Sequence, residues 1–376
     1  MDKQTFSLAA MVFCLSRLFL IIVLIIKPFA SYAEDNSPPK TSNQSPVLRI
    51  GVAYSLTGHA APWGTYGLDA LRMAKREIEK ESSLKIELLV EDTRTDPKNA
   101  VTAYQRLTKT QQVDLVLGDV WNHPTEPLIP LSAKDKITLI SPTYTETILK
   151  HPSEYFFSFG TKTELAAEAL DSFFKNNLAI KNITTFTYDS SWGDGYLNLI
   201  KRIAARNQVA VLKDYRTIDN GHDFKSEVIK AKQTNSAAVF FAFFHDTLFK
   251  EFDIHKFRPV IISSEDIYYY VGQKLLDPKL LESFDISVMD WQPSVEFMKS
   301  FENFTGKKHD YSAFCHYEAL KSIAKAYAAS PKDLVKGLKQ IKYAGVAGPI
   351  DFTRSFSGNW AKAIITKPFL STTSQN

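Results

Sequence analysis

The sequence has little cysteine and no strong excess of charge of either sign. Its 376 residues include two cysteines, Cys14 and Cys315, and the 45 Lys+Arg and 41 Asp+Glu residues give a net charge of +4. This balance gives no electrostatic basis for binding nucleic acid. A hydrophobic content of 44% is enough for a large buried core. The length indicates about two domains of ordinary size.

Motifs for phosphate binding and for common catalytic sites are also absent. No GxxxxGK[ST] occurs, and no GxGxxG follows a strand candidate. Neither GxSxG nor HExxH is present. The eight histidines are scattered, without a pair at metal-ligand spacing. Cys315 and His316 are adjacent on a predicted helix, where neighbouring side chains point in different directions. We therefore expect no cofactor, no metal ion and no enzymatic activity.

The first 33 residues are predicted to be a signal peptide. Arg17 precedes the apolar run Leu18–Ile26, and the small residues Ser31 and Ala33 suit cleavage after position 33. The alternative is an uncleaved membrane anchor. Arg17 interrupts the apolar segment, however, and leaves an uncharged part that is short for a membrane span. The sequence thus predicts export from the cytoplasm.

The leader does not have the pattern of a lipoprotein. Cys14 follows Phe13, whereas a lipidated cysteine is expected to follow a small residue. After cleavage the chain keeps one thiol, at Cys315, and cannot form an internal disulfide. Residues 34–46, rich in Pro, Ser, Asn and Lys, are predicted to be a disordered lead-in.

Apolar strand candidates alternate with amphipathic helix candidates along most of the remaining chain. This pattern predicts parallel sheets covered by helices on both faces. There are too many units for one doubly wound sheet, so we expect an α/β protein with two parallel-sheet lobes. The strands are expected at 49–54, 85–92, 113–118, 137–141, 182–189, 209–215, 237–244 and 258–263, with strand-like segments at 349–352 and 361–366. The helices are expected at 68–78, 97–107, 163–176, 195–206, 223–234, 312–329 and 332–341, with a further helical stretch between 118 and 137.

Polar and aromatic residues follow the predicted strands, where open parallel sheets bind their ligands. Hydroxyls and helix-start amides suit a carboxylate, an acidic side chain suits an ammonium group, and aromatic rings exclude water. The set therefore predicts a site for a small zwitterion. Its candidate residues are Trp63, Asn122, Thr143, Thr145, Trp192, Phe244 and Glu265.

Each candidate also has an interpretation without a ligand. Threonine and glutamate can cap helices, asparagine can form a local turn, and aromatic rings can pack in loops or cores. It is the joint placement after successive strands that favours a site. Helix capping is the alternative for Thr143, Thr145 and Glu265, and a local turn is the alternative for Asn122. Packing in a loop or a core is the alternative for Trp63, Trp192 and Phe244.

An ordered series of segments over residues 48–366 resembles one protein family. The segments include IGVAYSLTGHAAPWGTYGLDALRMAKREI, ITLISPTYTETIL, YDSSWGDGY and GVAGPIDFTRSFSGNW. They are similar to type I periplasmic substrate-binding proteins of ABC importers, in the leucine/isoleucine/valine-binding branch. The resemblance implies a monomer with two lobes, joined by three crossover strands near Gly160, Val288 and Gly345. Lobe 1 would comprise residues 47–160 and 289–345, and lobe 2 residues 161–288 and 346–370.

The resemblance also implies roles for the candidate residues. Thr145 matches the threonine that binds the ligand carboxylate, and Thr143 matches a position whose backbone faces the ligand. Glu265 matches the acidic residue that holds the α-ammonium group. Trp63 matches the aromatic residue in the first loop, and the aromatic positions lining the second lobe correspond to Trp192 and Phe244.

The chain departs from the family pattern at three points. Asn122, preceded by Trp121, stands in place of a serine, and Phe244 stands in place of a tyrosine. The first-lobe disulfide of some members is absent. Branched-chain, bulkier, aromatic and amide ligands therefore all stay open. The resemblance implies a membrane permease as partner for an importer. A sensing subunit that regulates a receptor is the alternative function.

Overall fold

The structure is a computed structural model that describes residues 47–143, 153–217, 222–242, 246–272, 276–308 and 311–369. The predicted signal peptide (1–33) and lead-in (34–46) lie outside these residues. Across the described ranges, no helix has the length and apolar character needed to span a membrane.

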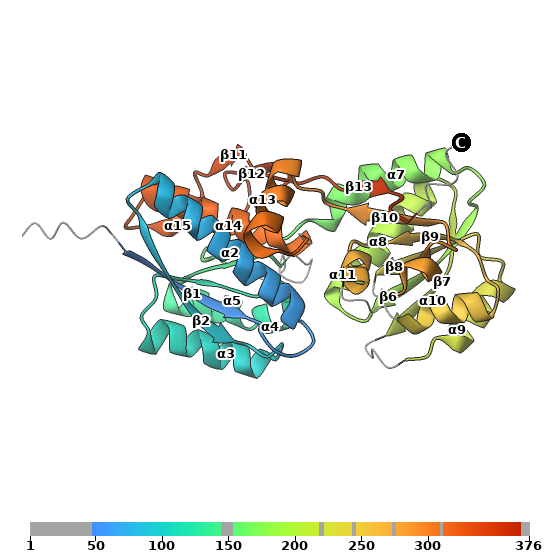
Figure 1. Cartoon of the computed structure of the whole chain (residues 1–376), viewed down its shortest axis with the longest axis horizontal. Coiled ribbons are helices and arrows are strands. Elements are labelled where there is room, and N and C mark those ends of the chain that lie inside the picture. Colours follow the sequence, from blue (N-terminus) through green and yellow to red (C-terminus); the bar gives the residue numbers. More distant parts are fainter. Residues whose placement is uncertain are drawn as a thin grey trace, which may run out of the picture. The chain divides into compact units, whose positions relative to one another are not determined.

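The first lobe is built on a sheet of parallel strands in the order β2-β1-β3-β4-β5 (Figure 1). The short inner strands are fully buried, as expected for a sheet covered on both faces. The strands are β1 (Val47–Tyr54), β2 (Lys85–Asp92), β3 (Leu115–Leu117), β4 (Thr138–Ser141) and β5 (Phe156–Ser158). The helices of this lobe are α2 (Ala61–Glu81), α3 (Pro97–Gln105) with the π-helical turn η1 (Arg106–Thr110), α4 (Asn122–Thr125), α5 (Leu128–Asp135), α13 (Val295–Thr305), α14 (Tyr311–Ala329) and α15 (Leu334–Leu338).

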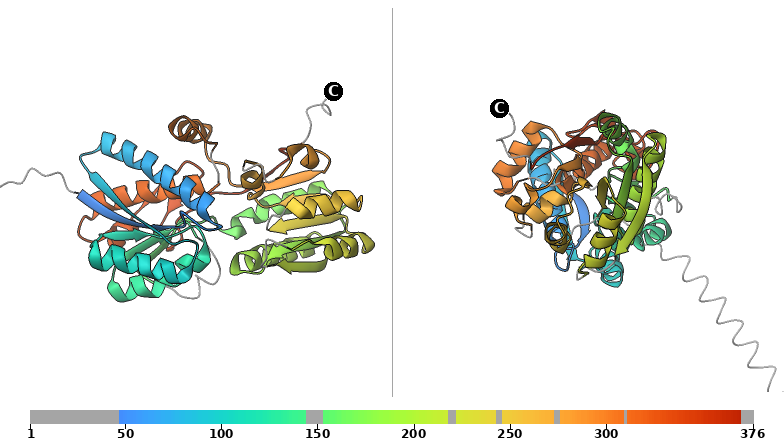
Figure 2. Two further views of the ribbon diagram at one scale, coloured as in Figure 1. Left: turned by 60° about the horizontal axis from the view of Figure 1, so that its bottom comes forward. Right: turned by 90° about the vertical axis from the view of Figure 1, so that its right-hand side faces the viewer.

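Alternate residues of β1 enter two different hydrophobic cores. Ile50 and Val52 pack in one core with residues of α2 and α14. Ala53 packs in another with residues of α3 and α5. Because successive side chains of a strand point to opposite faces, helices cover both faces of this sheet (Figure 2).

The second lobe is built on a sheet in the order β13-β10-β9-β8-β6-β7. Its strands are parallel except β13, which is antiparallel to β10. The strands are β6 (Asn182–Tyr188), β7 (Ala210–Thr217), β8 (Ala238–Ala242), β9 (Val260–Ser263), β10 (Ile286–Asp290) and β13 (Ile364–Thr366). The helices are η2 (Thr163–Ala166, 3-10), α7 (Ala167–Asn176), α8 (Ser191–Arg206), α9 (Lys225–Gln233), α10 (Asp246–Ile254), α11 (Ile267–Gly272) and α12 (Pro278–Leu281).

This second sheet is also covered on both faces. Phe240 of β8 belongs to a core with residues of α7 and α8. Its neighbours Val239 and Phe241 belong to a second core with residues of α9 and α10. Both sheets therefore have the doubly wound arrangement that the alternating sequence pattern predicted.

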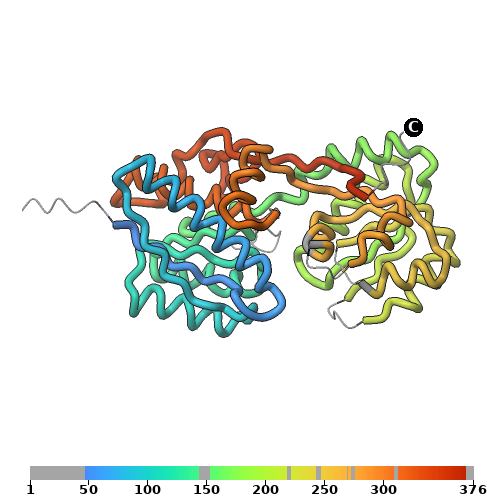
Figure 3. The backbone as a smooth tube through the Cα atoms, in the orientation of Figure 1, coloured from blue at the N-terminus to red at the C-terminus, as the bar shows by residue number. Residues whose placement is uncertain are grey.

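The chain passes between the two sheets three times: after β5, after β10 and before β13 (Figures 1 and 3). This confirms the predicted fold class. Between the second and third passages, β11 (Lys342–Ala344) pairs with β12 (Pro349–Asp351). Ser357 then forms a bridge with Ser158 of the first sheet. The chain then joins the second sheet at β13.

Two helices begin earlier than the apolar pattern indicated. Trp63 and Gly64 lie in the first turn of α2, and Trp192 and Gly193 in the first turn of α8, not in the preceding loops. Pro62 stands in the first turn of α2, where proline is well tolerated, and Ser190 caps α8 by accepting a hydrogen bond from Gly193 N. These first turns contain no apolar stripe, so periodicity could not detect them.

Candidate ligand-binding site

A buried carboxyl group joins the loops at the carboxyl edge of the first sheet. Asp119 follows β3, is 1% exposed, and accepts hydrogen bonds from Ser55 N at 2.6 Å and Trp121 N at 3.1 Å. Thr93 Oγ1 donates to it at 3.4 Å. Burial raises the pKa of Asp119, and these hydrogen bonds oppose the rise. The loops after β1, β2 and β3 are therefore connected through one side chain.

Asn122 forms hydrogen bonds with one residue of each lobe. Its Oδ1 accepts a hydrogen bond from the Thr143 hydroxyl, and its Nδ2 donates to Ser191 Oγ at 3.2 Å. Ser191 is the first residue of α8 in the second lobe. Asn122 makes no capping bond to α4, whose N-cap is Trp121. The local-turn alternative for Asn122 is therefore not what the structure contains.

Thr143 is buried directly after β4, at 1% exposure. Its amide donates to Ser141 Oγ at 3.1 Å, and its carbonyl accepts from Ser158 Oγ at 2.6 Å. Both backbone groups thus have protein partners, and the hydroxyl binds Asn122. The role of Thr143 toward a ligand stays a prediction.

Four aromatic rings gather after β1 and β3, in the loops that follow these strands and in α2 and α4. We call His59, Trp63, Trp121 and His123 the ring cluster. The centroid of Trp121 lies 4.9 Å from that of His59, 5.6 Å from Trp63 and 5.5 Å from His123. Desolvation, and then the neighbouring His123, lower the pKa of His59. The sequence analysis did not select either histidine. Their position after strand ends, in SLTGHAAPWG and DVWNHPT, is the signal that could have found them.

In the second lobe, a chain of contacts runs from the start of α8 to β9. The Trp192 ring packs edge-on against Tyr196, with centroids 5.0 Å apart. The Tyr196 hydroxyl donates to Glu265 Oε2 at 3.2 Å. Glu265 follows β9 and is 4% exposed. The side chain of Glu265 binds this hydroxyl, and its backbone carbonyl accepts from Tyr268 N.

Two buried acidic groups lie at neighbouring strand ends of the second sheet. Burial chiefly raises the pKa of Glu265 well above its usual value, and the charges of Asp266 and Asp290 add to the rise. Asp290, at the end of β10 and 8% exposed, has its pKa raised to about 6 by burial. Among the described residues, no basic side chain forms an ion pair with Glu265 or Asp290. The carboxyl groups of Glu265 and Asp290 are therefore buried at this edge of the sheet without a compensating cation from the described part of the chain.

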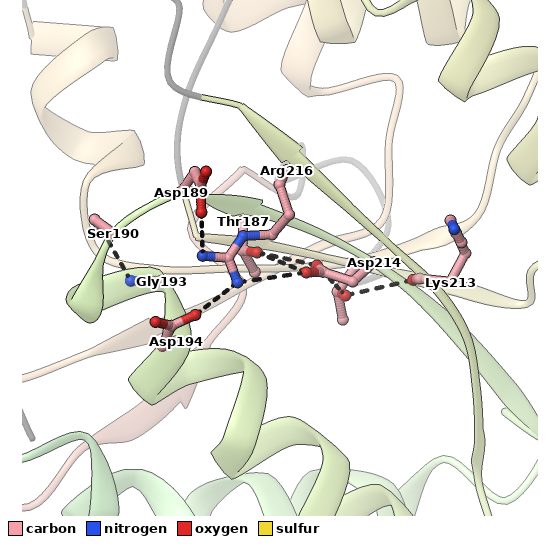
Figure 4. Close-up of polar contacts among 9 residues, drawn as sticks. Thr187, Asp189, Ser190, Gly193, Asp194, Lys213, Asp214 and Arg216 are labelled. Carbon is pink, nitrogen blue, oxygen red and sulfur yellow. Dashed lines mark hydrogen bonds and ion pairs between the residues drawn. The ribbon is translucent and has the colours of Figure 1, made fainter.

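An arginine holds the loop before α8 in place (Figure 4). Arg216 of β7 pairs with Asp189 at 2.9 Å and with Asp194 at 2.7 Å. Asp214 lies 3.7 Å from the same guanidinium group and accepts hydrogen bonds from Thr187 Oγ1. Asp189 and Asp194 bracket the first turn of α8. Arg216 therefore fixes the segment that carries Ser191 and Trp192.

Two predicted site residues, Thr145 and Phe244, lie outside the described residues. The convergence of Trp63, Thr145 and Glu265 around one ligand accordingly stays a prediction. The structure places Trp63 in the ring cluster and Glu265 in the buried acidic edge, each at the carboxyl end of its sheet. Within the described ranges, no group of three or more His, Cys, Asp or Glu side chains is arranged to hold a metal ion.

A family model for periplasmic binding proteins matches residues 47–367. The chain belongs to this family. The match covers both sheets and all three crossovers, and it confirms the resemblance to type I periplasmic substrate-binding proteins. A curated relative, an uncharacterised protein of Methanocaldococcus jannaschii, is 25% identical over 173 residues. The alignment covers 43% of this chain and 41% of the relative's length.

Solved structures of periplasmic binding proteins share the fold. The branched-chain amino acid binding protein LivJ of Streptococcus pneumoniae, in complex with isoleucine, has a TM-score of 0.71 and 16% identity, covering 86% of this chain and 100% of its own. A type 1 periplasmic binding protein of Bordetella pertussis has a TM-score of 0.75 and 16% identity, covering 88% of this chain and 98% of its own. A solute-binding protein of an ABC transporter from Rhodopseudomonas palustris is in complex with 3,4-dihydroxybenzoic acid. It has a TM-score of 0.69 and 18% identity, covering 83% of this chain and 90% of its own.

Proposed function

We propose that this periplasmic binding protein is the solute-capturing component of an ABC importer. Its ligand is a small amino acid or amino-acid-like molecule, which it presents to a membrane permease. The protein binds as a monomer, needs no cofactor and catalyses no reaction. It acts in the periplasm, after removal of the predicted leader at residues 1–33.

The observation that carries this proposal is the buried carboxyl group of Glu265. Its side chain is 4% exposed and is hydrogen-bonded to the Tyr196 hydroxyl, without an ion pair from the described residues. Burying a carboxylate costs free energy unless a cation or several hydrogen bonds compensate it. A ligand ammonium group would supply that cation. The nearby acidic side chain of Asp290 would strengthen the attraction.

The first lobe would bind the other end of the ligand. Asn122 and Thr143 place an amide and a hydroxyl at the carboxyl edge of its sheet, and Thr145 is predicted to add a second hydroxyl. Such groups bind a carboxylate well. Because the carboxylate and ammonium ends would be held by different lobes, the ligand would favour a closed state in which it contacts both. The permease would recognise that closed state.

The relatives show why the ligand must be inferred from this chain's own residues. The same fold holds isoleucine in the streptococcal protein and 3,4-dihydroxybenzoic acid in the Rhodopseudomonas protein. A fold can host unrelated ligands, because specificity depends on a few side chains in the site. The acidic residue at 265 favours ligands with an amino group.

Isothermal titration calorimetry with amino acids and their amides tests the proposal. We expect at least one of them to bind, and Glu265→Gln to weaken that ligand by about 2–5 kcal/mol, as for loss of one partner of a desolvated charge pair. Glu302→Gln is the matched control, because Glu302 is an exposed glutamate of α13. An equal affinity in the Glu265 and Glu302 variants would remove Glu265 from the site.

Uptake into membrane vesicles separates transport from sensing. Vesicles that carry a candidate permease and ATPase from the same organism should accumulate the ligand only when the binding protein is added. Ligand-dependent binding to a receptor, without uptake, would instead assign the protein to signalling.

A further inference from the structure

The ring cluster stands apart from the hydrophobic cores. Neither Trp63 nor Trp121 is among the residues of the hydrophobic cores described above. Trp63 is 8% exposed, Trp121 is half-buried, and His59 and His123 are exposed. Trp121 and the two histidines therefore reach the surface at the carboxyl edge of the first sheet, while Trp63 is buried with its ring against Trp121. Packing of a core does not explain why the half-buried indole of Trp121 is placed there.

The ring cluster is held in position by polar contacts. The Trp121 amide donates to Asp119 at 3.1 Å, and a ring nitrogen of His123 hydrogen-bonds the Thr95 carbonyl at 3.0 Å. Gly64 allows the first turn of α2, which carries Trp63, to lie against the Ser55 carbonyl. A preorganised surface binds its ligand more tightly, because fewer side chains must be ordered on binding.

The geometry does not suit a metal ion. The His59 and His123 rings are stacked at 6.0 Å with an interplanar angle of 15°, so their nitrogens do not converge on one point. Within the described residues, no third ligating side chain completes a group with these two histidines. The ring cluster is therefore an apolar aromatic surface with polar edges.

We infer that the captured ligand carries an aromatic ring, and this inference rests on the proposed function. The ring packs against Trp121 and Trp63, and the amino group of the ligand is held by Glu265. Aromatic pairs in offset or edge-on geometry are stabilised beyond the effect of buried area. Each such contact favours an aromatic ligand over an aliphatic one of similar size by about 2- to 10-fold. The second lobe adds the Trp192–Tyr196 pair beside Glu265. Aromatic amino acids and arylalkylamines are the ligand class that fits both lobes.

Calorimetric titration of two matched ligand series tests this inference. One series is L-phenylalanine, L-tyrosine, L-tryptophan and 2-phenylethylamine, and the other is L-leucine, L-isoleucine and L-valine. We expect the best aromatic ligand to bind at least 10-fold more tightly than the best aliphatic one. Trp121→Leu should weaken the aromatic ligand about 10-fold and change leucine binding less than 2-fold. Trp121→Phe should keep the aromatic preference.

The controls separate a specific role from a change in folding. Phe304→Leu removes an exposed aromatic ring from α13 and should leave both series unchanged. Circular dichroism and the unfolding midpoint of Trp121→Leu should match those of the unmodified protein. If the aliphatic series binds more tightly, or if Trp121→Leu weakens both series equally, the inference is wrong.

The outcomes also separate this inference from the proposed function. Binding of leucine, isoleucine or valine alone, lost in Glu265→Gln, would overturn the inference and support the function. Benzoate, which has a ring and no amino group, is the reverse probe. Tight benzoate binding that depends on Trp121 and not on Glu265 would support the ring contact and contradict capture through an ammonium group. Failure of every compound to bind would overturn both.

Discussion

Gly64 and Gly193 occupy equivalent positions in the two lobes. Each lies in the first turn of the helix that follows its lobe's first strand, and each comes directly after a tryptophan. A Cβ atom at Gly64 would overlap the Ser55 carbonyl oxygen, and one at Gly193 would overlap the Tyr188 carbonyl oxygen. The absence of a side chain therefore lets each helix start against the end of its strand, and this places the two tryptophans at the carboxyl edges.

Alanine at these glycines should be destabilising. The new methyl group would meet backbone atoms that cannot move aside, so we expect Gly64→Ala and Gly193→Ala each to lower the free energy of unfolding by about 1–3 kcal/mol. Gly195→Ala is the matched control in α8, since its Cβ would lie 3.4 Å from Thr163 Oγ1, an ordinary contact. That variant should be neutral or more stable by about 0.5–1 kcal/mol. Urea unfolding measures all three, and equal stability of the Gly193 and Gly195 variants would contradict the argument.

The sequence predicted the inner strands β4 and β8 well, because they are almost continuously apolar. The expected strand at 237–244 corresponds to β8 (Ala238–Ala242), and that at 137–141 to β4 (Thr138–Ser141). β5 (Phe156–Ser158) was not among the expected strands. Three residues are too few to establish a periodic pattern, and this strand is recognisable only from its pairing with β4.

The candidate site was only partly predictable from the sequence, because its contacts join distant residues. Asn122 bonds Ser191, and Tyr196 bonds Glu265; each pair is 69 residues apart. Position after a strand selected Asn122 and Glu265 without identifying their partners. No polar motif in the sequence marks Asp290, so this residue was not selected. Its proximity to Glu265 results from the pairing of β9 with β10.

Binding of an amine ligand should weaken as the pH falls. The pKa of Glu265 is raised by burial and by the charges of Asp266 and Asp290, so this carboxyl group gains its proton above the usual range. A protonated Glu265 cannot pair with an ammonium group. We expect calorimetric affinity to fall as the pH is lowered, while the amino group of the ligand itself stays charged.

Asp290→Asn tests the cause of this pH dependence. It removes one of the charges that raise the pKa of Glu265, so the midpoint of the affinity loss should move to lower pH. Asp285→Asn is the control, because Asp285 is half-exposed and pairs with Lys367 at 2.7 Å. A midpoint that moves equally in the two variants would show that Asp290 does not act on Glu265.

Asp290 should also make the unliganded protein less stable at neutral pH. Its pKa is raised from 3.8 to about 6, so between these values the folded protein binds the proton more strongly than the unfolded chain. Stability therefore falls as the pH rises from about 4 to above 6, by at most about 3 kcal/mol from this group. Urea unfolding of the unmodified protein and of Asp290→Asn, at pH 4 to 8, isolates the effect. As the pH rises, the free energy of unfolding of Asp290→Asn should increase relative to that of the unmodified protein. A difference in unfolding free energy that stays constant with pH would contradict the prediction.

Arg216 should act on ligand binding more than on global stability. Its ion pairs with Asp189 and Asp194 are partly exposed, and such pairs contribute roughly 1 kcal/mol or less each. In Arg216→Met, however, the two carboxylates lose their shared partner, and the first turn of α8 loses the contact that fixes Trp192. We expect faster amide hydrogen exchange over residues 189–194 and weaker ligand binding, with a small change in the unfolding midpoint. Arg202→Met is the matched control, because Arg202 lies on α8 outside its first turn and pairs with Glu164 of η2. Equal hydrogen exchange at 189–194 in the two variants would mean that Arg216 does not order the segment.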